Sequence, residues 1–275
     1  MGSVTHALQD QHFDIASLLN SDDISYDQFL ALRSFIEGDA DLVGRAFVGY
    51  LARNSTIDLN SSVSQPQVNS PQNPDSEIFL QYFSFMYADG LAFATYLYSN
   101  GRWDAVNNAY TNLPQSTEQI LQPRKYLAGD MPISVELADV SGILDDSWES
   151  VFTDTLGLFH LREYLSQYLS GGVVYLAVNG WGGDTISVYH QPDTDELAWM
   201  MGITWDDPLE KELREFGDAY VRFLENQFDE FTDMPFCGVS DAQTICFATT
   251  NTTSFIASAP TTDLAQALLT QLIGE

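Results

Sequence analysis

The sequence predicts an α+β protein in two parts. Apolar residues recur at helical spacing through most of the first 170 residues, whereas short apolar runs bounded by turn residues dominate the last third. We therefore expect a mainly helical part over residues 1–170 and an α+β part over residues 171–275, packed together as one unit. The apolar share of 45%, with 13% aromatic residues, is that of a globular protein with a real core.

The first part is expected to consist of helices joined by turns. Residues 54–76 are the exception, because Ser, Asn, Gln and Pro dominate there and predict a flexible loop. Ser116 or Thr117 is expected to cap a short helical turn. The longer helices are predicted over residues 4–19, 28–53, 77–100 and 149–169.

The second part is expected to form an antiparallel sheet. The order of its elements is β-β-β-α-β-β-α, which predicts helices on one side of the sheet. Trp181, in the turn N-G-W-G-G-D, is expected in the core, and Thr261 or Thr262 should cap the last helix. The strands are predicted over residues 173–178, 185–189, 197–205, 244–249 and 254–258, and the middle helix over residues 208–231.

The charge of the chain limits its partners. The formal net charge is −29, from 39 acidic and 10 basic residues. Nucleic acids and anionic membranes need a basic surface, so neither is expected as a partner. No apolar run reaches the ~20 residues that span a bilayer. The composition resembles that of proteins from extreme halophiles, particularly haloarchaea; an acidic protein from another source is the alternative.

The two cysteines leave a choice open. Cys237 and Cys246 flank a predicted turn, so they could form a local disulfide in an oxidising compartment or stay as two buried thiols. Their spacing excludes a zinc knuckle, which needs C-x-x-C pairs. No signal peptide follows Met1.

Residues 4–13, V-T-H-A-L-Q-D-Q-H-F, contain half of a zinc motif. In an H-E-x-x-H helix, two histidines four residues apart ligate one zinc ion and the glutamate activates a bound water. With His6 as the second histidine, the first histidine and the glutamate should stand at positions 2 and 3. This chain has Gly2 and Ser3 there.

These residues closely resemble a family of bacterial and archaeal zinc metallopeptidases whose active-site helix is H-E-L-T-H-A-L-Q-D-Q-H-F. The resemblance implies a zincin-like fold of the gluzincin type, a zinc cofactor, a peptide or protein substrate, and a place outside the cell or on its surface. It runs in patches across nearly the whole chain, including residues 87–126 and 180–184, and the family has a histidine at the position of Gln122.

A third zinc ligand is expected on the second helix. In gluzincins a glutamate on a later helix is the third ligand, and an aspartate four residues on orients a ligand histidine. Glu37 and Asp41 resemble that arrangement, since residues four apart share a helix face. The resemblance therefore assigns His6 and Glu37 to the metal and Asp41 to a supporting role. In an acidic protein, carboxylates on a solvated helix face are the plainer explanation.

Among the remaining histidines, His160 is the one that could assist catalysis, although a histidine between Phe159 and Leu161 is more often a packing residue. No role is assigned to His12 or His190. Two ligands without a general base should bind zinc weakly or not at all and hydrolyse little. Two explanations stay open: a natural start upstream that supplies an in-frame His-Glu, or a non-catalytic binding or structural module that has lost the site.

Overall fold

The computed structural model describes residues 2–21, 23–54, 74–206 and 211–274. The chain forms two compact units, a helical unit of residues 1–24 and 28–130 and a sheet unit of residues 25–27 and 131–275. Most of the predicted loop, residues 55–73, lies outside the described residues.

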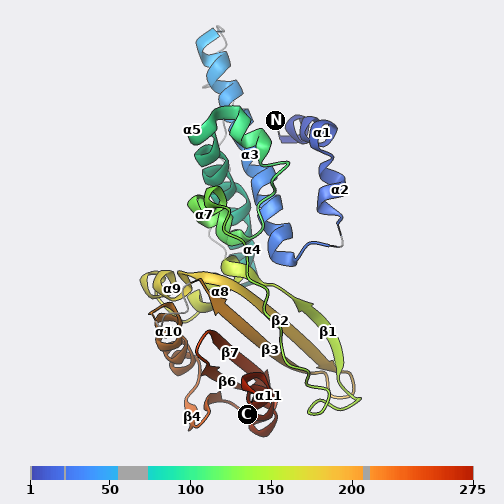
Figure 1. Cartoon of the computed structure of the whole chain (residues 1–275), viewed down its shortest axis with the longest axis vertical. Coiled ribbons are helices and arrows are strands. Elements are labelled where there is room, and N and C mark those ends of the chain that lie inside the picture. The colour runs from blue at the N-terminus through green and yellow to red at the C-terminus, as the bar shows by residue number, and fades with distance from the viewer. Residues whose placement is uncertain (1, 22, 55–73, 207–210, 275) are drawn as a thin grey trace. The chain divides into compact units, whose positions relative to one another are not determined.

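The helical unit contains seven α-helices and one π-helical turn among its described residues (Figure 1). They are α1 (Gly2–Phe13), α2 (Ile15–Leu19), α3 (Tyr26–Asn54), α4 (Pro74–Ser84), η2 (Phe85–Asp89), α5 (Gly90–Asn108), α6 (Thr117–Leu121) and α7 (Pro123–Ala128). One predicted helix is divided, and one predicted helix end is present as a break. Asp14 has a left-handed backbone that splits the helix predicted over residues 4–19, whereas Gly101 and Arg102 break α5 where its end was predicted.

Two glycines let α3 cross the α4–α5 helix at close range. A Cβ atom on Gly38 would overlap the backbone of Gly90, and one on Gly90 would overlap the backbone of Ser34. The crossing falls at the π-helical turn η2, where the backbone N–H of Gly90 donates to the carbonyl of Phe85 five residues earlier. The Ser34 hydroxyl also donates to this carbonyl, at 2.9 Å. The crossing thus fixes η2 against the middle of α3.

The sheet unit is built on a seven-stranded sheet in the order β1-β2-β3-β7-β6-β5-β4, with every neighbouring pair antiparallel. The α+β class and the antiparallel sheet are confirmed. Its elements are β1 (Glu149–Asp154), α8 (Gly157–Ser166), α9 (Gly171–Val178), β2 (Trp181–Gln191), β3 (Glu196–Trp205), α10 (Lys211–Gln227), β4 (Glu230–Asp233), β5 (Phe236–Val239), β6 (Thr244–Thr249), β7 (Thr253–Ala259) and α11 (Thr262–Ile273).

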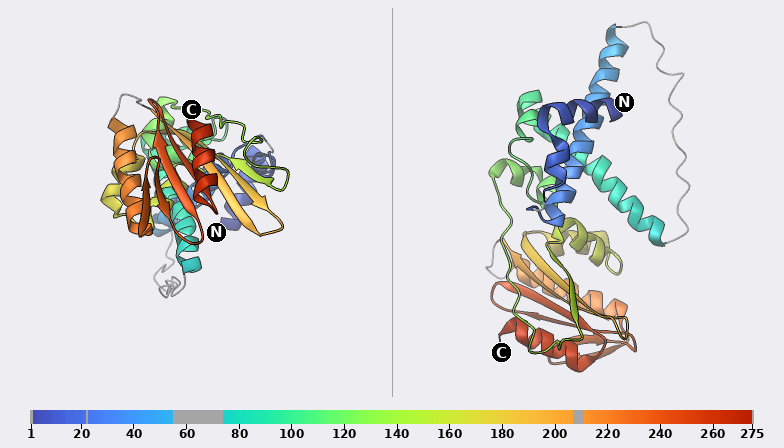
Figure 2. Two further views of the ribbon diagram at one scale, coloured as in Figure 1. Left: turned by 90° about the horizontal axis from the view of Figure 1, so that it is seen from below. Right: turned by 90° about the vertical axis from the view of Figure 1, so that its right-hand side faces the viewer.

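Helices cover both faces of the sheet, not one as predicted (Figure 2). α11 packs on β6 and β7, where its leucines join Cys246 and Ala257 in one apolar cluster. α10 lies on the opposite face, where the ring of Tyr220 is 4.9 Å from that of Phe247. Because β6 is covered on both faces, four consecutive residues from Thr244 are buried.

Two further predictions in this unit were wrong. Residues 173–178 form helix α9 rather than a strand, and the helix predicted over 149–169 is strand β1 followed by helix α8. β1 pairs with β2 and therefore belongs to the sheet. The continuous part of the sheet unit starts at Met131, earlier in the chain than residue 171.

Several local predictions are confirmed. Trp181 is fully buried, and Thr261 caps α11 by accepting a hydrogen bond from the Leu264 amide. Of the two alternatives left open for the cysteines, the structure has the disulfide: Cys237 and Cys246 face each other across β5 and β6 and are bonded. Within the residues described, no helix combines the length and the apolar character needed to cross a membrane.

Candidate functional site

The structure brings His6 and Glu37 together, although helix α2 lies between their helices in the chain. His6 Nε2, on α1, lies 3.2 Å from Glu37 Oε2, on the middle of α3, and both side chains are partly exposed. The resemblance to gluzincins assigned both residues to one metal site. The pair lies entirely within the helical unit.

A buried hydrogen-bond network holds α1 in this position. Gln9 Nε2 donates to the carbonyl of Ile36 at 3.1 Å, to Asp39 Oδ2 at 2.8 Å and to the Tyr110 hydroxyl at 2.8 Å. The Tyr110 hydroxyl in turn donates to Asp39 at 2.7 Å, and its ring stacks on Phe13 at 4.0 Å. Thr5 and Gln9 therefore form the buried face of α1, while Ala7 and Leu8 are exposed.

The same network fixes which nitrogen of His6 carries a proton. The carbonyl of Ile36 and the carboxylate of Asp39 can only accept hydrogen bonds, so the Gln9 amide must point its nitrogen at them. Its oxygen then faces His6 Nδ1 at 2.9 Å and accepts the Nδ1–H bond. A neutral His6 would consequently aim the lone pair of Nε2 at a carboxylate. That contact is favourable when His6 is an imidazolium or when a cation lies between the two groups.

The spacing suits a shared zinc ion in part. Zinc binds histidine nitrogen and carboxylate oxygen at about 2.0–2.2 Å, and the tetrahedral angle then separates two ligand atoms by roughly 3.4 Å. The observed 3.2 Å is close to that value. Zinc sites in proteins use three or four protein ligands, whereas this pair supplies two. The residues present thus fit half of a zinc site.

Glu37 also has neighbours that the sequence did not predict. Arg33 Nη2 lies 4.0 Å from Glu37 Oε1, and the Tyr87 hydroxyl of η2 forms a hydrogen bond with the Glu37 carboxylate. Burial raises the pKa of the Tyr87 phenol, and the charge of Glu37 raises it further, against an opposing effect of Arg33. Tyr87 therefore stays a hydrogen-bond donor near neutral pH.

Asp41 lies one turn beyond Glu37 and is paired with Arg45, whose Nε donates to Asp41 Oδ2 at 3.1 Å. The structure places Gln9, rather than Asp41, at His6 Nδ1. Glu37, Asp41, Arg45 and Tyr87 contribute to the lining of a pocket of about 500 Å³.

The other histidines lie elsewhere. His12 is exposed on α1. His160 belongs to the sheet unit, where its Nδ1–H donates to the Leu156 carbonyl at 2.7 Å; burial lowers its pKa, so the ring is neutral at pH 7. His190 Nε2 lies 2.9 Å from the exposed carboxylate of Asp195.

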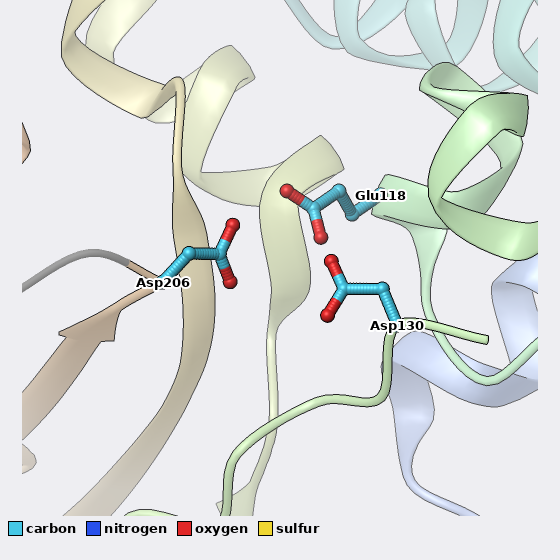
Figure 3. A group of neighbouring side chains, drawn as sticks. All are labelled: Glu118, Asp130 and Asp206. Atoms are coloured by element: carbon cyan, nitrogen blue, oxygen red, sulfur yellow. The ribbon is translucent and has the colours of Figure 1, made fainter. Parts of the chain in front are cut away.

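The second stretch that resembles the peptidase family, S-T-E-Q at residues 116–119, is buried and has structural contacts. Ser116 caps α6 by accepting from the Gln119 amide at 3.3 Å, as predicted. Lys125 Nζ lies 2.7 Å from Glu118 Oε1 and 3.2 Å from Asp130 Oδ2. Figure 3 shows these two carboxylates pointing toward each other; the lysine compensates their charge.

Two functional candidates were missed by sequence reasoning. Gln9 lies three residues after His6, a spacing that puts both on one helix face, so the signal was present in the motif. Tyr87 had no such signal, because its place beside Glu37 depends on the crossing of two helices distant in the chain.

Comparisons with known proteins add one finding. A family model described as a domain of unknown function (DUF8575) matches residues 147–269, which lie in the sheet unit. Searches of curated proteins and of solved structures found no match. The His6–Glu37 pair lies outside the matched residues.

Proposed function

We propose that this protein is a non-hydrolytic relative of zinc metallopeptidases whose helical unit binds a divalent transition metal, such as zinc, between His6 and Glu37. One observation carries the proposal: the Gln9 network turns the unprotonated Nε2 of a neutral His6 toward a carboxylate 3.2 Å away. Bound there, the metal would be a Lewis acid with open positions for water or a ligand.

Hydrolysis is not expected from this chain. Ser3 stands where the motif has its glutamate, so no general base is present at that position, and Gly2 removes a ligand. A form that carries histidine and glutamate at these positions would have three zinc ligands and a base, and its substrate class would be peptides or proteins. The zincin relationship rests on residues 4–13 and on the His6–Glu37 pair.

Zinc binding by matched histidine variants tests the proposal. The titration is run by calorimetry with excess Mg²⁺, which occupies non-specific carboxylate sites on this acidic surface. We expect a dissociation constant on the order of 10 μM, because two ligands supply about half the binding free energy of a full site. His6→Ala should weaken binding at least about tenfold, whereas His12→Ala, on the same helix, should bind as the wild type does. Equal binding by both variants would refute the metal site.

The double substitution Gly2→His with Ser3→Glu tests the relationship to peptidases. It should tighten zinc binding and produce measurable casein hydrolysis in high salt. Failure of this variant to bind zinc more tightly than the wild type would count against a zincin-like site.

A non-catalytic structural module is the second candidate, and Arg33 favours it. With His6 as an imidazolium, the Arg33–Glu37–His6 group is an ion-pair cluster that fastens α1 to α3 without metal. In that case the wild type takes up no zinc and His6→Ala lowers the melting temperature.

We also propose that the protein works outside the cytoplasm. The support is the Cys237–Cys246 disulfide, because disulfides persist in oxidising compartments and are rare in the reducing cytosol.

A further inference from the structure

The pocket beside Glu37 is a trough on the surface of α3. Ala40, Gly44 and Val48 are spaced four residues apart and so share one face of the helix. A Cβ atom on Gly44 would meet nothing within 4 Å. The space of about 500 Å³ falls within the range of ligand pockets, so the small residues leave room for a large side chain from a partner.

One wall of the trough continues into an exposed row of aromatic rings. Tyr87 lines the trough, and the Phe83 ring lies 4.4 Å from the Tyr87 ring and 6.1 Å from the Phe79 ring. Phe79 is 65% exposed, Phe83 47% and Tyr87 37%. Figure 2 (right) shows α4, which carries the row, diverging from the upper half of α3. Aromatic rings exposed in a row beside a pocket are typical of an interaction surface.

The negative charge of the chain favours a cationic partner for this surface. The trough is lined by Glu37 and Asp41, each with an arginine within 4.0 Å, whereas the chain as a whole carries a net charge of −29. A second copy would bring the same charge against itself, which disfavours self-association at moderate salt. A cationic partner is attracted by the field of the whole chain, and its basic groups can lie over the exposed rings.

We propose that this trough and the aromatic row bind a cationic peptide segment, one large apolar side chain filling the space over Gly44 and flanking Lys or Arg side chains lying on Phe83 and Phe79. The site shares Glu37 with the proposed metal site but needs no metal. Binding measured in a chelator therefore separates a failure of this proposal from a failure of the proposed function.

Fluorescence anisotropy with three labelled peptides provides the first test. The probes are KFKLFK, its acidic counterpart EFELFE and its polar counterpart KSKSSK, each titrated with the full chain in EDTA. KFKLFK should bind at least about tenfold more tightly than either counterpart, because the acidic one is repelled and the polar one buries no large side chain. Equal binding of EFELFE and KFKLFK would overturn the proposal.

A matched pair of glycine variants provides the second test. Gly44→Leu fills the trough, whereas Gly49→Leu makes the same change on the same helix at a position outside the pocket lining. Both should fold, since leucine is a better helix former than glycine. Gly44→Leu should weaken KFKLFK binding about tenfold and Gly49→Leu should leave it within about twofold.

A variant outside α3 tests the aromatic row. Phe83→Ala should weaken KFKLFK binding about threefold through loss of the ring beneath a cation.

Two results with Gly44→Leu would overturn the proposal. The first is wild-type affinity of this variant for KFKLFK. A wild-type dimer in sedimentation experiments that Gly44→Leu dissociates would overturn it in favour of a second copy as the occupant.

Discussion

Each unit contains a buried aspartate whose carboxylate accepts several hydrogen bonds, and the two carboxylates support different parts of the structure. In the helical unit, Asp39 accepts from Gln9 and Tyr110, which fixes α1 and so presents His6 to Glu37 at the surface. In the sheet unit, Asp184 accepts from the Leu156 and Gly157 amides and from the Trp181 indole, each within 2.9 Å. A buried acid thus positions a surface site in one unit and maintains the core in the other.

The largest effect is expected at the helix crossing, on which the position of Tyr87 and Glu37 depends. Gly38→Ala should lower the free energy of unfolding by about 3 kcal/mol, because its Cβ overlaps the backbone of Gly90. Gly44→Ala, in the same helix but facing open space, should raise it by about 0.5–1 kcal/mol. Thermal unfolding followed by circular dichroism measures both, and similar values for the two variants would show that the crossing is loose.

The disulfide should stabilise the sheet unit by a slightly smaller amount. Cys237 and Cys246 are 9 residues apart, and closing so short a loop is worth about 2.5 kcal/mol in the chain-entropy description. Replacing both cysteines by alanine should lower the urea midpoint. Tryptophan fluorescence follows this unit, because four of the five tryptophans belong to it. An unchanged midpoint would contradict the prediction.

The smallest of the three effects is the pH dependence that Asp184 gives to the stability of the sheet unit. Burial raises the pKa of Asp184 to about 6, against the lowering effect of its three hydrogen bonds. Between these two pKa values, the native Asp184 keeps its proton, whereas in the unfolded chain, where its pKa is the ordinary 3.8, the side chain has lost it. The protonated Asp184 therefore contributes its full stabilisation at a pH below the pKa of the unfolded chain. This contribution to the free energy of unfolding falls by about 2 kcal/mol between about pH 4 and about pH 6.

Asp184→Asn isolates that contribution from the other acids, because the variant keeps an acceptor and does not titrate. The difference in free energy of unfolding between wild type and variant should shrink as the pH rises from about 4 to about 6. A constant difference would mean that Asp184 is ionised throughout this range.

Sequence reasoning predicted those parts of the fold whose signals are local. Strands β2, β3, β6 and β7, the caps Ser116 and Thr261, and the break after Asn100 all follow from patterns within a few residues. Residues 173–178 were assigned wrongly because V-V-Y-L-A-V suits a buried strand as well as a buried helix. β1 was missed because its pairing with β2 joins residues more than thirty positions apart, such as Asp154 and Ile186.

The same distinction applies to the candidate site. His6 and Glu37 could be named because short stretches around them resemble the zinc-ligand segments of gluzincins. Asp41 was expected to support His6. Helix spacing does not determine which neighbouring side chain a carboxylate contacts, and Asp41 forms an ion pair with Arg45, four residues further along the helix. The contribution of Tyr110 to holding α1 needs a contact over 101 positions, which no local pattern contains.

The π-helical turn η2 determines the direction in which the side chains of the preceding helix, α4, point relative to those of α5. Each residue in an α-helix turns the chain by about 100°, and a single π turn accommodates one extra residue. Through η2, the face of α4 that carries Phe79 and Phe83 is aligned with Tyr87 and with Glu37 on α3. Without the extra residue the same sequence would direct its aromatic side chains about a quarter turn away, so one residue of helix length determines whether the aromatic row and the carboxylate share a surface.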